Sequence, residues 1–137
     1  MERVPTLEVL HPPGWAPAVG YANGIAVSGG RIVFVAGQVG WDAQQRFASD
    51  DIVAQFAQAL RNVLEVVARA GGRPEHVCRI TAYCCDRAAY LAARPKLAAV
   101  WRGMMGRHYP AMSMIFVADL LDHPGKIELE ATAVVPT

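Results

Sequence analysis

In the segment from Lys126 to Val135, polar and apolar side chains alternate as far as Ala133. One set of positions carries Lys126, Glu128, Glu130 and Thr132, and the other carries Ile127, Leu129, Ala131 and Ala133. A period of two is typical of a β-strand with one face buried and one face open. The segment therefore predicts a sheet that is covered on one side.

A helix that can supply this cover is predicted between Ser49 and Gly72. Its apolar residues recur at spacings of three and four: Ile52, Phe56, Leu60, Val63 and Val67. These spacings place them on one face of a helix of about five turns. Ser49-Asp50-Asp51 offers a capping oxygen and negative charge at its start, and Gly71-Gly72 ends it.

Two strands are predicted before this helix. Tyr21–Val27 and Arg31–Ala36 flank the turn Ser28-Gly29-Gly30, and we expect them to form a β-hairpin. The first twenty residues contain four prolines, so this segment is expected to run as an extended lead-in without a regular helix.

After the first helix, His76–Cys85 is rich in β-branched and aromatic residues and is predicted to be a strand. In Arg87–Met105 a proline in the helix interior would be costly, so we expect a short turn and then a helix whose first turn holds Pro95 and which ends at Gly106. Ala111–Val117 is a further predicted strand.

The resulting order is β-β-α-β-α-β-β, in one domain over residues 1–137. It predicts an α+β fold, with two helices on one face of a mixed sheet and the other face uncovered. Hydrophobic residues make up 53% of the chain and charged residues 18%, against about a quarter in an ordinary soluble protein. This apolar excess predicts that copies of the chain form a closed ring that buries the open faces.

Charge and hydropathy exclude several classes of partner. Thirteen Lys and Arg against twelve Asp and Glu give a net charge of +1, which favours neither nucleic acid nor an anionic membrane. No apolar run approaches the ~20 residues that span a bilayer, and no signal peptide is recognisable, so a cytoplasmic protein is predicted. We interpret Cys78, Cys84 and Cys85 as small buried hydrophobic residues.

The chain lacks the common catalytic and metal-binding motifs. It has no His-x-x-x-His, Gly-x-Ser-x-Gly, phosphate loop or Gly-x-Gly-x-x-Gly. The four histidines are isolated in the sequence: His11, His76, His108 and His123. We therefore predict no metal site.

Several short motifs, taken together, resemble the Rid family, the YjgF-like reactive-intermediate deaminases that are also called endoribonuclease L-PSP proteins. The resemblance covers about residues 16–135. It rests on Gly20-Tyr21, Arg31-Ile-Val-Phe-Val-Ala-Gly37-Gln38, the helix that ends in Ala-Gly-Gly, the strand that ends in Asp86, Pro110-Ala111-x-Ser113 and Lys126-Ile-Glu-Leu-Glu-Ala-Thr-Ala-Val-Val135.

The resemblance implies a chorismate-mutase-like fold and a homotrimer with clefts between neighbouring subunits. It also implies hydrolysis of small enamines and imines to a ketoacid and ammonia, without metal or cofactor. In the family pattern Pro-Ala-Arg-Ser, the arginine pairs with the substrate carboxylate. Met112 stands at that place here, so 2-aminoacrylate is disfavoured as the substrate and an aminomuconate-type acid is the favoured alternative.

The same resemblance implies roles for individual residues. Glu128 matches the glutamate that activates the attacking water, although an exposed glutamate is also ordinary on a strand. Tyr21 matches a residue that donates a hydrogen bond to substrate, or it covers the core. Gly37 and Met114 match backbone positions that line the cleft. Trp41 has no counterpart and either walls the pocket or packs in the subunit interface.

Arg94 falls where the family pattern has an asparagine that lines the cleft, and we predict that it replaces the missing arginine from across the subunit boundary. The alternative is a solvated arginine on a helix. Two other functions stay open. Met112 favours a trimeric protein that binds a small ligand without catalysis, whereas a ribonuclease would need a basic track that the sequence lacks.

Overall fold

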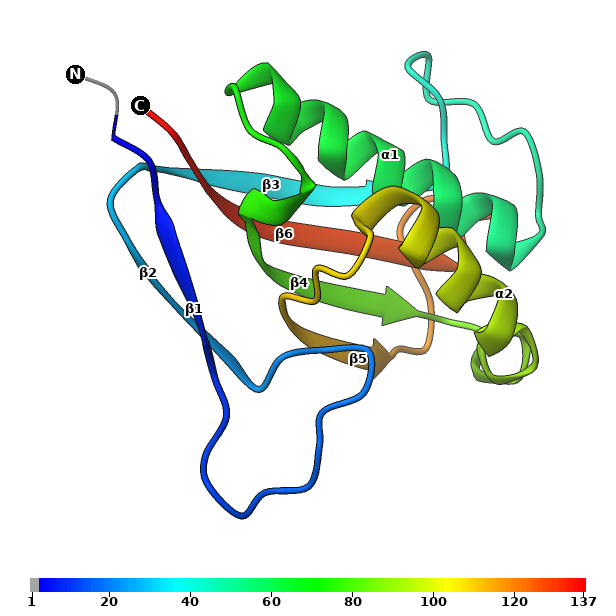
Figure 1. Cartoon of the computed structure of the whole chain (residues 1–137). Helices are drawn as coiled ribbons and strands as arrows, with labels where there is room; N and C mark the ends of the chain where they lie inside the picture. Colours follow the sequence, from blue (N-terminus) through cyan, green and yellow to red (C-terminus); the bar gives the residue numbers. More distant parts are fainter. Residues whose placement is uncertain (1–2) are drawn as a thin grey trace.

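The predicted sheet is present in the computed structural model, which describes residues 3–137 (Figure 1). Four strands form it in the order β3-β6-β4-β5: β3 (Arg31–Val39), β6 (Ile127–Val135), β4 (Val77–Cys84) and β5 (Ala111–Phe116). The central strand β6 runs antiparallel to both of its neighbours, whereas β4 and β5 are parallel. The mixed sheet of an α+β fold is thereby confirmed.

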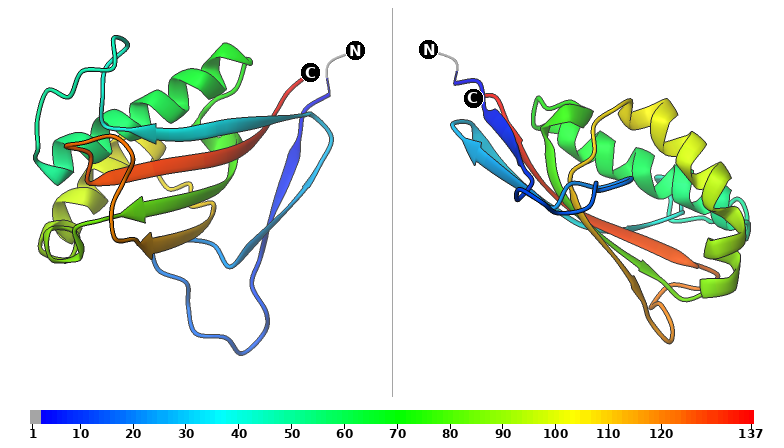
Figure 2. Two further views of the ribbon diagram at one scale, coloured as in Figure 1. Left: turned by 180° about the vertical axis from the view of Figure 1, so that it is seen from behind. Right: turned by 60° about the horizontal axis from the view of Figure 1, so that its bottom comes forward.

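Both helices lie on one face of this sheet, and the opposite face is open (Figure 2). They are α1 (Ile52–Arg69) and α2 (Arg87–Met105), and a short 3-10 turn, η1 (Pro74–His76), leads into β4. Helix α1 begins as predicted, because the Asp51 side chain accepts a hydrogen bond from the Ala54 amide at 3.0 Å. Its C-terminal end turns at Gly71, where φ is +88°.

The core lies between the helices and the sheet. Its fully buried side chains include residues of α1, β4 and the apolar positions of β6 that the alternation predicted, among them Leu60, Val63, Val67, Ile80, Ile127, Leu129 and Ala133. Cys78 and Cys84 are buried as expected, and burial raises the pKa of both thiols. Cys85 is half-buried.

The expected turn before Pro95 is wrong. Helix α2 begins at Arg87, where the Asp86 side chain caps it by accepting a hydrogen bond from the Ala89 amide, and it continues through Pro95. Proline has no amide hydrogen and its ring crowds the carbonyl four residues earlier, so it bends a helix. Figures 1 and 2 show that the first turns of α2 run in a different direction from the rest. Here Pro95 lies in the interior of the helix and kinks it, instead of standing in its first turn.

The expected hairpin is also wrong. Strand β2 (Gly24–Ser28) pairs antiparallel with β1 (Thr6–Leu10), not with β3. The prolines at positions 5 and 12 flank β1 without interrupting it, so five residues of the predicted lead-in provide β2 with a partner. Between β2 and β3, Gly29 and Gly30 both adopt positive φ, and Gly30 packs so closely on the Val135 carbonyl that a Cβ would lie 2.6 Å away.

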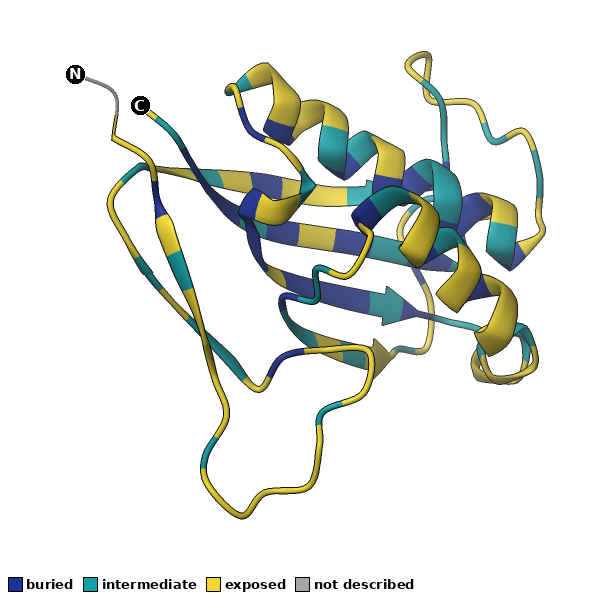
Figure 3. Cartoon of the chain, viewed as in Figure 1, coloured by how far each residue is buried: buried dark blue, intermediate teal, exposed yellow. Residues whose placement is uncertain are grey.

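Residues 6–28, which comprise β1, β2 and their connection, form an arm beside the main sheet (Figure 1). Figure 3 shows that most of this arm is exposed or only half-buried. It joins the body at Ala22, which forms a bridge with Ala111 and whose amide donates to the Pro110 carbonyl at 2.9 Å. The arm thus crosses from the start of β3 to the start of β5.

The open face of the sheet carries exposed apolar side chains on β3. Phe34 is 80% exposed and Ile32 is 60% exposed. The uncovered face that the element order predicted is therefore present in the single chain.

Candidate functional site

Glu128 stands on the open face of the central strand. In the strand pairing it lies opposite Val39 of β3 and Tyr83 of β4, while its neighbours Ile127 and Leu129 point into the core. The position is half-buried. Its carboxylate therefore stands on the uncovered side of the sheet, partly shielded from water.

Gly37 makes room for this carboxylate. The pairing of β3 with β6 shifts between Val35 and Gln38, so that Ala36 and Gly37 have no partner residue in β6. Such a bulge bends a strand and re-aims side chains beside it. A Cβ on Gly37 would lie 2.9 Å from the Glu128 carboxyl carbon and 3.2 Å from its Oε1. The structure thus brings together two residues that the sequence predicted for one site.

The surroundings of Glu128 favour its protonated form. Burial raises the pKa of this carboxyl group, and the negative charges of Asp122 and Glu130 raise it further. A raised pKa brings proton exchange by a glutamate closer to neutral pH. This is the property that general acid-base catalysis requires.

Tyr83 and Glu130 form a second polar pair on the same face. The Tyr83 hydroxyl donates a hydrogen bond to Glu130 Oε1 at 2.7 Å, and this bond raises the pKa of the tyrosine. A hollow of about 290 Å³ adjoins the pair. Its lining includes Phe34, Arg79, Thr81, Glu130 and Thr132. The sequence analysis missed Tyr83 and Arg79, although both occupy alternate positions of a predicted strand.

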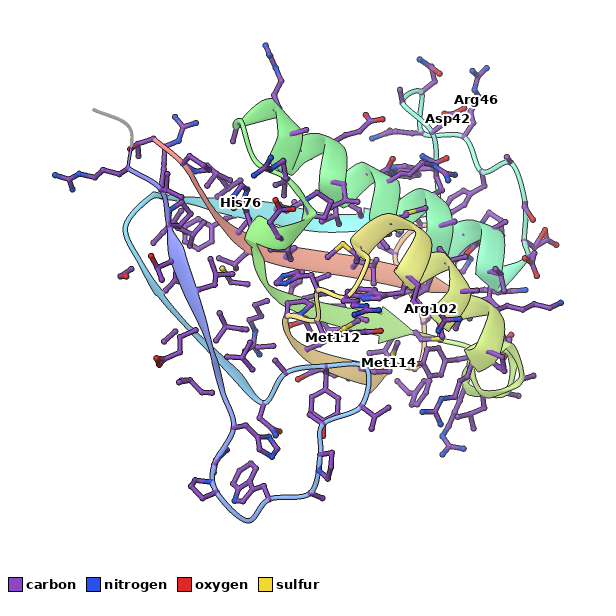
Figure 4. The ribbon with its side chains drawn as sticks, viewed as in Figure 1. Asp42, Arg46, His76, Arg102, Met112 and Met114 are labelled. Carbon is purple, nitrogen blue, oxygen red and sulfur yellow. The ribbon has the colours of Figure 1, made fainter. Side chains whose placement is uncertain are left out.

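Met112 and Met114 lie on the other face of the sheet. They pair with the buried residues Ile80 and Ala82 of β4, and both side chains pack against the core (Figure 4). Paired residues of neighbouring strands share a face. Within one chain the two methionines are therefore separated from Glu128 by the sheet itself.

The remaining predicted residues are also apart from Glu128. Tyr21 lines a separate hollow where the arm meets the segment between α2 and β5. The Trp41 ring packs against Phe47 at 5.7 Å between ring centres, and its carbonyl accepts a hydrogen bond from Asn62 Nδ2. Arg94 is exposed on α2 and makes no ion pair with any of residues 3–137. Its role across a subunit boundary stays a prediction.

Metal binding and membrane crossing can be assessed over residues 3–137, the part of the chain that the structure describes. Between residues 3 and 137, His, Cys, Asp and Glu side chains do not gather in a group of three or more that could hold a metal ion. Over the same range, neither helix has the length and apolar character that crossing a membrane requires.

Comparison with known proteins identifies the family. The model of the endoribonuclease L-PSP family matches residues 13–135. The chain belongs to this family. The match includes Gly37 and Glu128 and extends over the region for which the sequence motifs predicted it. The resemblance to the Rid proteins is thereby confirmed.

Individual members of the endoribonuclease L-PSP family are similar over nearly the whole chain. The RutC family protein PM1466 of Pasteurella multocida is 30% identical over 128 residues, which are 93% of this chain and 97% of that protein. The Rid-family protein YyfB of Yersinia pestis is 33% identical with a TM-score of 0.83, and the match covers 94% of this chain and 98% of YyfB. The YjgF gene product of E. coli is 29% identical with a TM-score of 0.65, over 85% and 90% of the two chains. The chorismate-mutase-like fold of the family is thereby confirmed.

Proposed function

We propose that the protein hydrolyses a small enamine or imine to a carbonyl compound and ammonia, without a cofactor. The observation that supports this function best is the Glu128 carboxylate seated over Gly37 on the open face of the sheet. A carboxyl group with a raised pKa beside exposed backbone is suited to exchanging protons with a small ligand. Membership of the endoribonuclease L-PSP family supports the same reaction through the relatedness to Rid proteins.

The chemistry needs one group that accepts and returns a proton. An enamine becomes an imine when a proton moves from nitrogen to carbon. Ionised Glu128 then takes a proton from water as the water oxygen bonds to the carbon of the protonated imine, and the C=N electron pair moves to nitrogen, which gives a neutral carbinolamine. Glu128 returns its proton to this nitrogen, which makes it a leaving group. The C–N bond then breaks while the hydroxyl oxygen forms the C=O bond, ammonia leaves, and the hydroxyl proton passes to water.

A site completed by neighbouring copies is part of this proposal. Tyr21, Arg94 and Met112 lie away from Glu128 within one chain, so only a second copy can place their counterparts beside it. Phe34 and Ile32 on the open face provide apolar surface for such an assembly. We propose a homotrimer, in agreement with the family pattern that the sequence resembles.

The substrate we propose is an acid other than 2-aminoacrylate. Met112 takes the place of the carboxylate-binding arginine and packs against the core instead of pairing with a ligand. An aminomuconate-type acid is consistent with a cleft that holds the substrate carboxylate without the arginine of the family pattern. Arg94 of a neighbouring copy is the cation that the sequence predicts for its carboxylate.

Substitution Glu128→Gln tests the function. We expect it to lower the rate of ammonia release from imines generated in situ by an amino-acid oxidase by at least about 100-fold, because a proton-transfer group contributes 10²–10⁴-fold. Glu65→Gln, on the exposed side of α1, is the matched control and should leave the rate unchanged. Equal rates for the wild-type protein and Glu128→Gln would contradict the proposal.

A protein that binds a small ligand without catalysis is the second candidate, and Met112 is the observation that favours it. This function predicts that a small acid binds and is recovered unchanged. No imine would then be hydrolysed faster in the presence of the wild-type protein than in buffer. Ligand recovery analysed by mass spectrometry distinguishes the two candidates.

A further inference from the structure

A hollow of about 470 Å³ lies where the arm meets the segment between α2 and β5. Its volume is in the range of small-molecule sites. Its polar and aromatic lining consists of His11, Tyr21, Asn23, Arg107, His108 and Tyr109, and the other lining residues are valine, proline and alanine. Segments far apart in the sequence thus form one mainly apolar pocket with a few polar groups.

The walls of this hollow are fixed by contacts with the core. Tyr109 stacks on Trp101 with 5.9 Å between ring centres and 11° between ring planes, and Trp101 is buried. Trp101 Nε1 donates to the His108 carbonyl at 3.1 Å, and His108 Nε2 donates to the Val77 carbonyl at 2.6 Å. A pocket with such walls is formed before a ligand arrives, which reduces the entropy lost on binding.

His11 is already engaged through both ring nitrogens. Its Nε2 donates to the Trp15 carbonyl at 3.2 Å, and its Nδ1 accepts from Asn23 Nδ2 at 3.2 Å. Both ring nitrogens are thus occupied by hydrogen bonds within the arm. His11 therefore shapes the wall of the hollow and has no ring nitrogen left for a ligand.

Arg107 is the permanent cation of the lining. It is exposed, and its guanidinium makes no ion pair and no side-chain hydrogen bond with any of residues 3–137. In contrast, Arg73 and Arg46 pair with nearby carboxylates. A free guanidinium beside two tyrosines is suited to a carboxylate attached to a flat apolar group.

We propose that this hollow binds a small organic acid, with Arg107 pairing with the carboxylate and with Tyr21 and Tyr109 contacting the apolar part. The choice of an acid as ligand rests on the proposed function. Arg107 and Tyr21 line the same hollow within the single chain, whereas Arg94 does not line it.

Benzoate is a probe for this site, and benzamide is its uncharged counterpart. We expect benzoate titrated into the wild-type protein to shift the amide NMR signals of residues 18–23 and 107–109, and benzamide to bind at least about tenfold more weakly. Arg107→Ala should weaken benzoate binding by about tenfold or more, and Arg107→Lys by less, because lysine keeps the charge without the fork of donors. Arg102→Ala, an exposed arginine at the end of α2, should bind like wild type.

Three results would overturn the inference: benzoate binding equal in Arg107→Ala and wild type, a loss in Arg102→Ala as large as in Arg107→Ala, or signal shifts around Glu128 instead of the hollow. A loss in Arg94→Ala alone would assign the carboxylate to that residue and equally reject Arg107. Turnover is measured separately. Benzoate binding through Arg107 without ammonia release from imines would support this site and contradict the proposed function.

Discussion

At the scale of single residues, the absence of a side chain at Gly37 sets the position of Glu128. The φ of Gly37 lies outside the left-handed region, so alanine suits the backbone, but its Cβ would lie 2.9 Å from the Glu128 carboxyl carbon. We expect Gly37→Ala to displace the carboxylate and to lower ammonia release by about ten- to a hundredfold, since small misplacements of a catalytic group are costly. Thermal unfolding should change little.

Gly103→Ala is the control for this variant. No atom of residues 3–137 outside its own helix backbone and chain neighbours lies within 4 Å of a Cβ at this position of α2. The substitution should leave activity unchanged and stabilise the protein by about 0.5–1 kcal/mol, because alanine loses less entropy in a helix than glycine. If both variants keep full activity, the proposed role of the Gly37 backbone is wrong.

The charges around Glu128 predict the pH dependence of activity. As a base Glu128 must be ionised, and its pKa is raised, so activity should be lost with falling pH earlier than for an ordinary glutamate. Asp122→Asn removes a negative charge that opposes this ionisation. The midpoint of the kcat/KM profile should therefore move to lower pH, with Glu65→Gln as the unshifted control. A midpoint that stays or rises would remove Glu128 as the base.

Some site residues could be predicted from sequence and others could not. Alternation placed Glu128 on the polar face of its strand, and the motifs indicated Gly37. Their contact depends on a bulge in the pairing of β3 with β6, which side-chain periodicity does not reveal. The residues next to Arg107 in the sequence do not indicate a binding role. Its hollow is formed together with the arm, and the pairing that builds the arm was not predicted.

At the scale of elements, Gln55 ties α1 to the segment that enters β6. Its buried amide donates to the Ser49 and Pro124 carbonyls at 3.0 Å, and its Oε1 accepts from the Lys126 amide at 2.7 Å. Gln55→Leu keeps the volume but leaves these backbone groups without partners. We expect a loss of about 2–4 kcal/mol in the free energy of unfolding, measured by urea denaturation.

Gln58→Leu, one turn further along α1, is the matched control. Gln58 is only half-buried and bonds to Asn62 and Arg61 on its own helix. Its loss should cost less than about 1 kcal/mol. Similar losses for the two variants would mean that Gln55 does not anchor the approach to Glu128.

Three strands of the main sheet were predicted closely. The bounds of β4, β5 and β6 agree with the predictions to within one residue at each end. Alternation marks β6, and β-branched and aromatic residues mark β4. The partner of β2 could not be derived in the same way. A turn sequence reports local geometry, whereas the choice of β1 over β3 depends on pairing between segments that are distant in the chain.

At the scale of the whole molecule, the open face predicts the assembly. We expect light scattering to give a mass near three times 14.8 kDa. Phe34→Asp should reduce this mass to that of a monomer, because it places a charge in the proposed apolar interface.

Leu121→Asp is the control for the assembly. Leu121 is 94% exposed, and it lies in the loop before β6 and not on the sheet. This variant should keep the mass of the wild-type protein. A wild-type protein that is monomeric at micromolar concentration would contradict the trimer and, with it, a cleft shared between copies.

The fold class could be predicted because local periodicity indicates both the order of the helices and strands and which face of each is apolar. The complete site could not, since Glu128 and Gly37 lie on one face of the sheet while Met112 and Met114 lie on the other. Local periodicity assigns residues to faces within one chain. It carries no information on which faces of separate copies meet.

The position of β6 has a consequence for how the protein is made. This strand lies between β3 and β4, yet it follows both in the sequence. A ribosome therefore produces both neighbours before the strand that joins them. Until β6 is made, β3 has no partner in the main sheet and β4 can pair only with β5. Since contacts so distant in sequence form slowly, the sheet closes only after synthesis has passed Val135. Nascent chains arrested before β6 would therefore leave the apolar residues of β3 and β4 exposed, which is the kind of surface that chaperones bind.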